Sequence, residues 1–217
     1  MSKKQKGRSK QSSAKYSKSK INQTTQRTSI WLLSPIIFIL SVLPFIIKLK
    51  EYNTNLSKFS WFTSFDQYTD IFLYYKQSFF LIAVLIMAVI VLFKAYTDRK
   101  NIENTHILIP LAIYATLAFL SSVFSKYRSF SFRGIYSHFE SVFVLLGYCL
   151  IVYYCLQIIK SEQDVRLIVN CFVVSVIVMS LLGLTQYFGQ DFFSTTLGRK
   201  LILPRANWNA LDTLQFN

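Results

Sequence analysis

Five long segments without Asp, Glu, Lys or Arg constrain this 217-residue chain more than any other feature. At a rise of about 1.5 Å per residue, each can cross or nearly cross a hydrocarbon core of about 30 Å as a helix. They show no alternation of polar and apolar residues, which a membrane barrel would need. We therefore predict an all-α, polytopic membrane protein with five transmembrane helices at residues 30–47, 77–93, 107–124, 141–159 and 167–188.

The charge of the chain lies in its tails and loops. The formal net charge is +14 although 53% of the residues are hydrophobic. A basic chain often binds nucleic acid, but the sequence has no recognition-helix pattern, no zinc spacing and no aromatic-basic sheet signature. The three cysteines lie in apolar segments without CxxC spacing, and no nucleotide-binding glycine pattern occurs. We expect no nucleic-acid partner, no metal and no cofactor.

Basic residues also predict the orientation. Residues 1–29 contain nine Lys or Arg and no acid, which predicts a disordered basic cytoplasmic tail that binds anionic lipids through residues 1–28. Segments on the same side as this tail contain 14 basic residues in 49 positions, against 10 in 74 on the other side. The positive-inside rule therefore places the N-terminus inside and the C-terminus outside. Residues 189–217 become an extracytoplasmic tail, which we expect to be truncated.

The loop between the third and fourth predicted spans has the most varied chemistry. Its candidate site residues are Lys126, Arg128, Arg133, Tyr136 and His138. Arg128 and Arg133 can bind a phosphate or diphosphate through bidentate hydrogen bonds from their guanidinium groups. His138 is a candidate base, because a neutral imidazole accepts protons near neutral pH. Basic side chains that flank helix ends also reach lipid head groups, and a loop histidine is often simply solvated. Both interpretations remain open on these residues alone.

Local patterns predict how some helices begin and bend. Ser137–Glu140 and Ser161–Asp164 have the spacing of a helix-capping box, each before an apolar segment. Pro35 and Pro44 should kink the first span or shorten its regular part. No predicted span contains an ionisable acid or base, whereas ion-coupled transporters usually place such groups in the membrane. A transporter is therefore disfavoured.

Three stretches together resemble the O-antigen ligase and polymerase family. Ala115–Ser125 is similar to the family's span ending in Ser-x-x-x-Ser, and Phe132–Ser141 is similar to the glycine-containing outer loop that follows it. Leu181–Gly189 resembles the Gly-x-x-Gln-Tyr-x-Gly ending of the next span. The resemblance covers roughly residues 107–191. The turn reads His138-Phe139-Glu140-Ser141 here, where the family has an Arg-Tyr-Glu-Gly-like sequence.

The resemblance implies a multi-pass enzyme of the bacterial cytoplasmic (inner) membrane. Such enzymes take glycans from polyprenyl-diphosphate carriers at the outer face, in surface polysaccharide biosynthesis, and bind the diphosphate through outer-face arginines. Family members continue through further spans and a large outer loop. We therefore expect the amino-terminal part of a glycosyltransferase-type ligase, inactive alone, that needs its carboxy-terminal half or a partner chain. The alternative is a non-catalytic membrane scaffold or partner protein of cell-envelope machinery.

Overall fold

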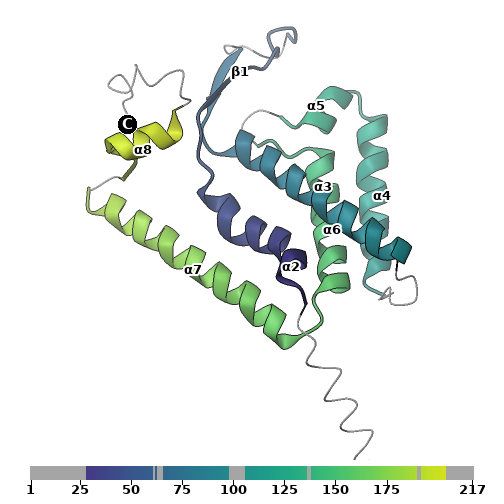
Figure 1. The fold of residues 1–217 in the computed structure, drawn as a ribbon. Helices are drawn as coiled ribbons and strands as arrows, with labels where there is room; N and C mark the ends of the chain where they lie inside the picture. Colours follow the sequence, from purple (N-terminus) through teal and green to yellow (C-terminus); the bar gives the residue numbers. More distant parts are fainter. Residues whose placement is uncertain are drawn as a thin grey trace, which may run out of the picture.

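Helices follow one another up and down through the molecule, in the positions of the five apolar segments (Figure 1). The first helical segment consists of α2 (Ile30–Ile37), η1 (Phe38–Val42) and η2 (Leu43–Phe45). The others are α3 (Leu73–Thr97), α4 (Leu108–Phe124), α6 (Val142–Ile158) and α7 (Glu162–Tyr187). This computed structural model describes residues 28–60, 62, 66–97, 106–135, 138–189 and 192–203.

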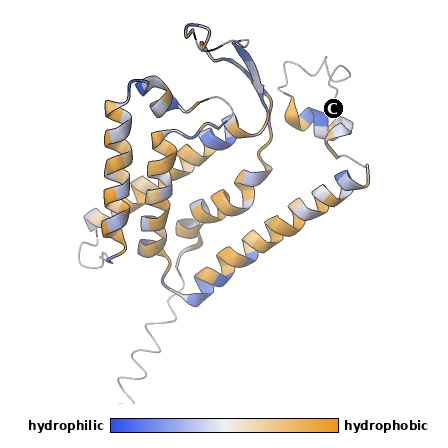
Figure 2. Ribbon diagram, turned by 180° about the vertical axis from the view of Figure 1, so that it is seen from behind, coloured by the Kyte–Doolittle hydropathy of each residue, from blue (hydrophilic) through white to orange (hydrophobic). Residues whose placement is uncertain are grey.

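Two of the described helices, α3 and α7, are long and apolar enough to cross a membrane. The core helix of a water-soluble protein passes the same test, but such a helix is mostly buried. Only 17% of the most apolar stretch of α3 and 11% of that of α7 are buried. Figure 2 shows apolar residues around the helices and polar residues gathered near their ends. So large an exposed apolar surface is unusual for a protein in water.

Two prolines break the first helical segment, as its sequence predicts. Pro35 has no N–H to donate to the carbonyl of Trp31, and the Ser34 hydroxyl donates to that oxygen instead, at 2.8 Å. The regular α-helix ends at Ile37, and a π-helical turn and a 3₁₀ turn containing Pro44 follow. The first predicted span is therefore helical throughout most of its length, but irregular in its second half.

The core lies where α2, α3, α6 and α7 meet. Its buried residues are Leu33, Ile36, Met87, Tyr154, Ile158 and Ile168. The Tyr154 hydroxyl donates to the carbonyl of Leu32 at 2.6 Å, which satisfies a polar group inside this apolar cluster. Gly147 allows α6 to approach α3 closely, because a Cβ at this position would lie 2.8 Å from the ring of Phe80.

The structure is mostly helical, as predicted, but the segment between the first and second helices contains two short strands that the all-α prediction did not include. Strands β1 (Lys50–Asn53) and β2 (Gln67–Asp70) pair antiparallel in a hairpin, with Lys50 opposite Asp70 and Tyr52 opposite Tyr68. The opposite charges and the two aromatic rings are favourable cross-strand pairs. We call this end of the molecule the hairpin end; α3 and α6 begin there.

The predicted outer tail, residues 189–217, is partly folded. The short helices η4 (Phe192–Ser194) and α8 (Thr196–Ile202) lie within it. Ile202 and Leu203 are buried against Leu49, whose N–H donates to the carbonyl of Ile202 at 2.8 Å. The segment 192–203 is therefore attached beside the hairpin, while residues 204–217 lie outside the described part.

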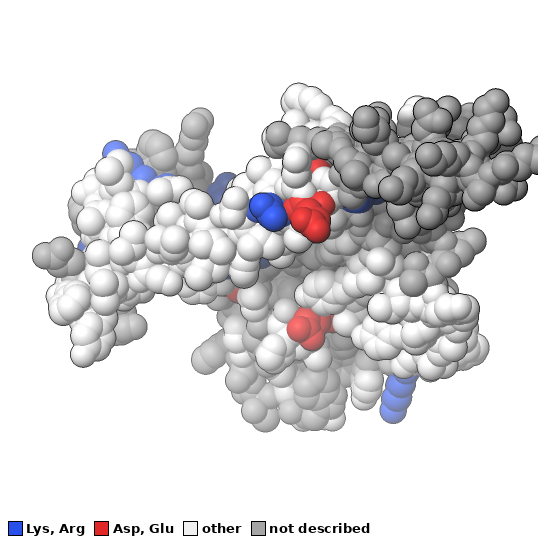
Figure 3. All heavy atoms as spheres, turned by 90° about the horizontal axis from the view of Figure 1, so that it is seen from below, with Lys and Arg blue, Asp and Glu red and all other residues white. Residues whose placement is uncertain are grey.

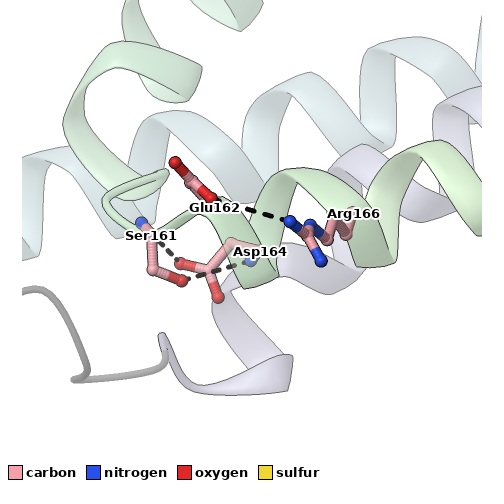
Figure 4. Close-up of polar contacts among 4 residues, drawn as sticks. All are labelled: Ser161, Glu162, Asp164 and Arg166. Carbon is pink, nitrogen blue, oxygen red and sulfur yellow. Dashed lines mark hydrogen bonds and ion pairs between the residues drawn. The ribbon is translucent and has the colours of Figure 1, made fainter.

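At the opposite end, which we call the junction end, α7 begins with the predicted capping box. The Ser161 hydroxyl accepts from the N–H of Asp164 at 3.2 Å, and the Asp164 carboxylate accepts from the N–H of Ser161 at 3.3 Å (Figure 4). Glu162 and Arg166 form an exposed ion pair at 3.7 Å beside it. Viewed from this end, the described surface shows only a few charged side chains among uncharged ones (Figure 3).

Asp164 also holds the chain just before α2. The N–H and the hydroxyl of Thr28 donate to its carboxylate at 3.3 and 2.6 Å, and the hydroxyl lies 3.2 Å from the carbonyl of Ile158. The predicted disordered tail, residues 1–29, therefore extends too far, because Thr28 and Ser29 belong to the folded part. Residues 1–27, which carry the predicted lipid-binding charge, lie outside the described residues.

Candidate functional site

An open pocket of about 190 Å³ lies at the hairpin end, between η2 and the first turns of α3 and α6. Its polar lining comes from Lys76 and Gln77 on α3 and from His138 and Glu140 just before α6. The rest of the lining is apolar or aromatic and consists of Leu43, Leu73, Phe80, Phe139, Val144 and Tyr148. An ammonium, an imidazole, an amide and a carboxylate thus share a pocket whose remaining lining is apolar or aromatic, which suits a polar group joined to an apolar one.

Hydrogen bonds fix the two helix starts that form this pocket. The Asp70 carboxylate accepts from the N–H groups of Leu73 and Tyr74 at 2.8 and 2.7 Å, and so caps α3. The Gln77 amide donates to the hydroxyl of Ser141 at 3.4 Å. Ser141 is the N-cap of α6, where its hydroxyl accepts from the N–H of Val144. The first turn of α3 and the cap of α6 are therefore held side by side.

The predicted capping role of the Ser137–Glu140 pattern is wrong, because α6 begins four residues later than that pattern requires. Ser141 takes the capping position, and Glu140 precedes the helix with its side chain exposed at the pocket. Ser137 itself lies outside the described residues. Glu140 is consequently available to line the pocket.

Two unusual backbone conformations place His138 in the pocket. Gly134 has φ +85°, and a Cβ at this position would lie 2.8 Å from the carbonyl carbon of Phe139. Phe139 has φ +53°, which is rare for an aromatic residue. Its buried ring packs edge-on against Tyr52 and Tyr74, with centroid distances of 5.5 and 5.8 Å. The aromatic contacts offset the backbone strain and hold His138 between α3 and α6.

Among the predicted site residues that the structure describes, His138 alone lies in the lining of this pocket. Arg128 and Arg133 are the first and last residues of α5 (Arg128–Arg133), and both are exposed. Lys126 is also exposed, with its ammonium nitrogen 5.8 Å from the centre of the Tyr127 ring. Tyr136 lies outside the described residues. The backbone of Arg133 lies next to the pocket, because the Gln77 amide also donates to the carbonyl of Arg133, at 3.5 Å.

Sequence reasoning missed Lys76 and Gln77. Both stand at the start of the second apolar segment, and the candidate loop leads into the fourth. Successive long helices alternate in direction, so the starts of α3 and α6 lie at the same end of the molecule. From that alternation, the sequence could have predicted that Lys76 and His138 lie at the same end of the molecule. Which side chains share one pocket depends on the packing of α3 against α6.

The hairpin loop is organised around Asp66 and contacts the start of α5 through Phe59. The Asp66 carboxylate accepts from the hydroxyl and the N–H of Ser57 and, at 3.2 Å, from the hydroxyl of Thr54. Phe59 in the same loop packs against Tyr127 and Phe130, with centroid distances of 5.9 and 5.7 Å. The loop is therefore a hydrogen-bonded turn that packs against α5, the short helix that contains Arg128 and Arg133.

We predict that the carboxyl of Asp66 titrates below the ordinary range of an aspartate. The Ser57 hydroxyl contributes most to lowering this pKa, followed by the Ser57 N–H. A lowered folded pKa means that the turn is fully stabilised above about pH 4 and loses this stabilisation as pH falls through the folded pKa. Carbon-13 NMR of the carboxyl group should show the titration, and Ser57→Ala should move it upward. A pKa unchanged by Ser57→Ala would contradict the assignment.

Among the described residues, no three His, Cys, Asp or Glu side chains gather to form a metal site. No protein-family model matches the chain, and no curated protein or solved structure matches it either. The pocket at the hairpin end is therefore the basis on which a function can be argued.

Proposed function

We propose that this chain is the carrier-binding, amino-terminal part of a membrane glycan ligase or polymerase. It spans the bacterial cytoplasmic membrane five times, with its N-terminus inside and its hairpin end at the outer face. There it binds polyprenyl-diphosphate-linked glycans used in surface polysaccharide biosynthesis. The basic residues of segment 1–27 attach to anionic lipids on the inner side.

The pocket at the hairpin end is the observation that carries this proposal. A polyprenyl-diphosphate glycan has an anionic diphosphate between a hydrocarbon chain and a sugar. The pocket is lined by Lys76 and His138, with Glu140 beside them, and by apolar residues such as Phe80 and Val144, at the end of apolar helices. Lys76 binds the diphosphate as a point charge, while Arg133 and Arg128 on α5 are exposed cations at the same end of the molecule.

The chemistry that such a pocket serves is glycosyl transfer. An acceptor hydroxyl oxygen bonds to the anomeric carbon of the glycan, and the bond between that carbon and the diphosphate oxygen breaks. The carrier leaves as polyprenyl diphosphate, whose charge needs cations nearby. The acceptor hydroxyl loses its proton to a base, and neutral His138 is the candidate within the pocket. Carrier binding is the step that the described residues support best.

The test is binding of long-chain polyprenyl diphosphate to the purified full chain in detergent, measured by native mass spectrometry. We expect Lys76→Ala to weaken binding about tenfold or more, because a charge-assisted hydrogen bond to the diphosphate is lost. Lys58→Ala is the matched control: Lys58 is an exposed lysine in the hairpin loop at the same end and does not line the pocket. It should bind as the wild type does.

Two results would overturn the proposal. If the wild-type chain shows no preference for polyprenyl diphosphate over an uncharged polyprenol, the pocket does not bind the diphosphate. If Lys76→Ala and Lys58→Ala bind equally, Lys76 has no part in it. Either result would favour a scaffold or partner protein in cell-envelope machinery.

A further inference from the structure

The long helix α7 lies at one edge of the molecule and packs mainly against α2 and η1 (Figure 1). The residues that it buries there are Asp164, Ile168 and Ser175, which recur at intervals of four and seven residues and so share one face of the helix. Most of the other α7 side chains are apolar and exposed, although the helix is long and apolar enough to cross a membrane. The side opposite the buried face therefore points away from the described helices.

That opposite side has a regular spacing along the whole span. Its residues follow one another in steps of three, four, three, four and three, which keeps them on one side of a helix. At about 100° of rotation per residue, Ile177 points about 160° away from the buried Ser175. We call this side the free face of α7. It consists of Asn170, Val173, Ile177, Ser180, Leu184 and Tyr187, all of which are exposed.

Asn170 restricts what can cover the free face. It lies three residues inside the predicted span 167–188, one turn after Arg166. Its amide has donors and an acceptor, and no other described residue forms a hydrogen bond with it. An unpaired polar group among hydrocarbon chains is costly, and asparagine is shorter than the Lys and Arg side chains that reach back to head groups. The surface that covers this face must therefore be apolar, with a polar group at the depth of Asn170.

A second copy of this chain meets both requirements. Two copies inserted in the same direction in one membrane have parallel α7 helices, so equal residue numbers lie at equal depths. Asn170 then meets Asn170 of the second copy across a two-fold axis, and each amide donates to the carbonyl of the other. A charged residue would repel its own copy, whereas an amide is self-complementary. One asparagine in such a seven-residue repeat fixes the register of a parallel helix pair, and the small Ser180 permits close approach.

We infer that the free face of α7 is the interface between two copies of this chain in the membrane. The inference needs α7 to be a membrane span, but it does not depend on the ligand of the pocket at the hairpin end. It adds a partner and a surface to the proposed function.

Disulfide cross-linking of the full chain in lipid vesicles locates the interface. Single cysteines are introduced after Cys149, Cys155 and Cys171 have been changed to alanine. We expect Ile177→Cys to give a cross-linked dimer, because parallel helices bring the two copies of residue 177 together. Val178→Cys is the matched control, since Val178 is also apolar and exposed at the same depth but lies outside the free face. Equal cross-linking of both variants, or of neither, would overturn the inference.

Asn170→Val tests the polar contact. We expect it to weaken self-association about 3- to 30-fold, the range for one hydrogen bond between membrane helices. Association is measured by Förster transfer between labelled copies at a series of protein-to-lipid ratios. Thr185→Val is the control, because its hydroxyl lies outside the free face and donates to the carbonyl of Leu182 in the same helix.

Thermal unfolding checks that each variant folds. A wild-type chain that stays monomeric at every ratio would show that lipid or a different helix covers the free face, and would overturn the inference. Wild-type association of a folded Asn170→Val protein would overturn it as well.

Discussion

Replacing Gly134 with alanine should destabilise the protein by about 2–5 kcal/mol and remove ligand binding at the hairpin end. Gly134 has φ +85° and ψ 156°, a region that is essentially restricted to glycine. The added Cβ would lie 2.8 Å from the carbonyl carbon of Phe139, and a backbone atom cannot rotate away as a side chain can. The segment would have to shift, and with it His138.

Thermal unfolding in detergent measures the first effect, and polyprenyl diphosphate binding measures the second. Gly183→Ala is the control, because a Cβ on Gly183 in α7 has no heavy atom within 4 Å. Alanine is favoured over glycine within a helix, so this variant should be as stable as the wild type or slightly more stable. A Gly134→Ala protein with unchanged stability and binding would show that the loop tolerates another backbone conformation.

The helices could be predicted from the sequence because absence of charge over 17 or more residues is a local property. The predicted segment 107–124 and α4 (Leu108–Phe124) differ by one residue. The hairpin was missed because its register depends on a distant pair, such as Lys50 with Asp70, across a loop that Asp66 organises. Each strand has only four residues, too few for a periodic pattern to distinguish it from a loop.

The candidate site was predictable in part for a similar reason. His138 lies in a loop of unusual composition, and composition can be read directly from the sequence. Lys76 and Gln77 lie in the first turns of α3, some 60 residues earlier, and meet this loop only through the contact of α3 with α6. The Ser161–Asp164 capping box was predicted from local spacing and is confirmed. Its bond to Thr28, 136 residues away, required the folded chain.

The hydrogen bond between Thr28 and Asp164 is the basis of the second prediction with a large expected effect. Asp164→Ala should destabilise the protein by about 2–4 kcal/mol. The carboxylate accepts three hydrogen bonds at the junction end, from the N–H and hydroxyl of Thr28 and from the N–H of Ser161. Its loss removes one half of the capping box of α7 and leaves the buried N–H of Ser161 without its side-chain acceptor. It also releases Thr28, and so loosens the start of α2 from the start of α7. Thermal unfolding of the full chain in detergent measures the change.

Glu162→Ala is the matched control, since Glu162 is an acidic residue in the same first turn whose side chain is 88% exposed. Its ion pair with Arg166 lies in water, where such pairs contribute about 0–1 kcal/mol. Thr28→Val separates the two roles of Asp164, because it removes the hydroxyl donor while the capping box stays intact. We expect it to cost less than Asp164→Ala. If Asp164→Ala and Glu162→Ala lowered the stability of the protein by the same small amount, the contact between Thr28 and Asp164 would not hold α2 to α7.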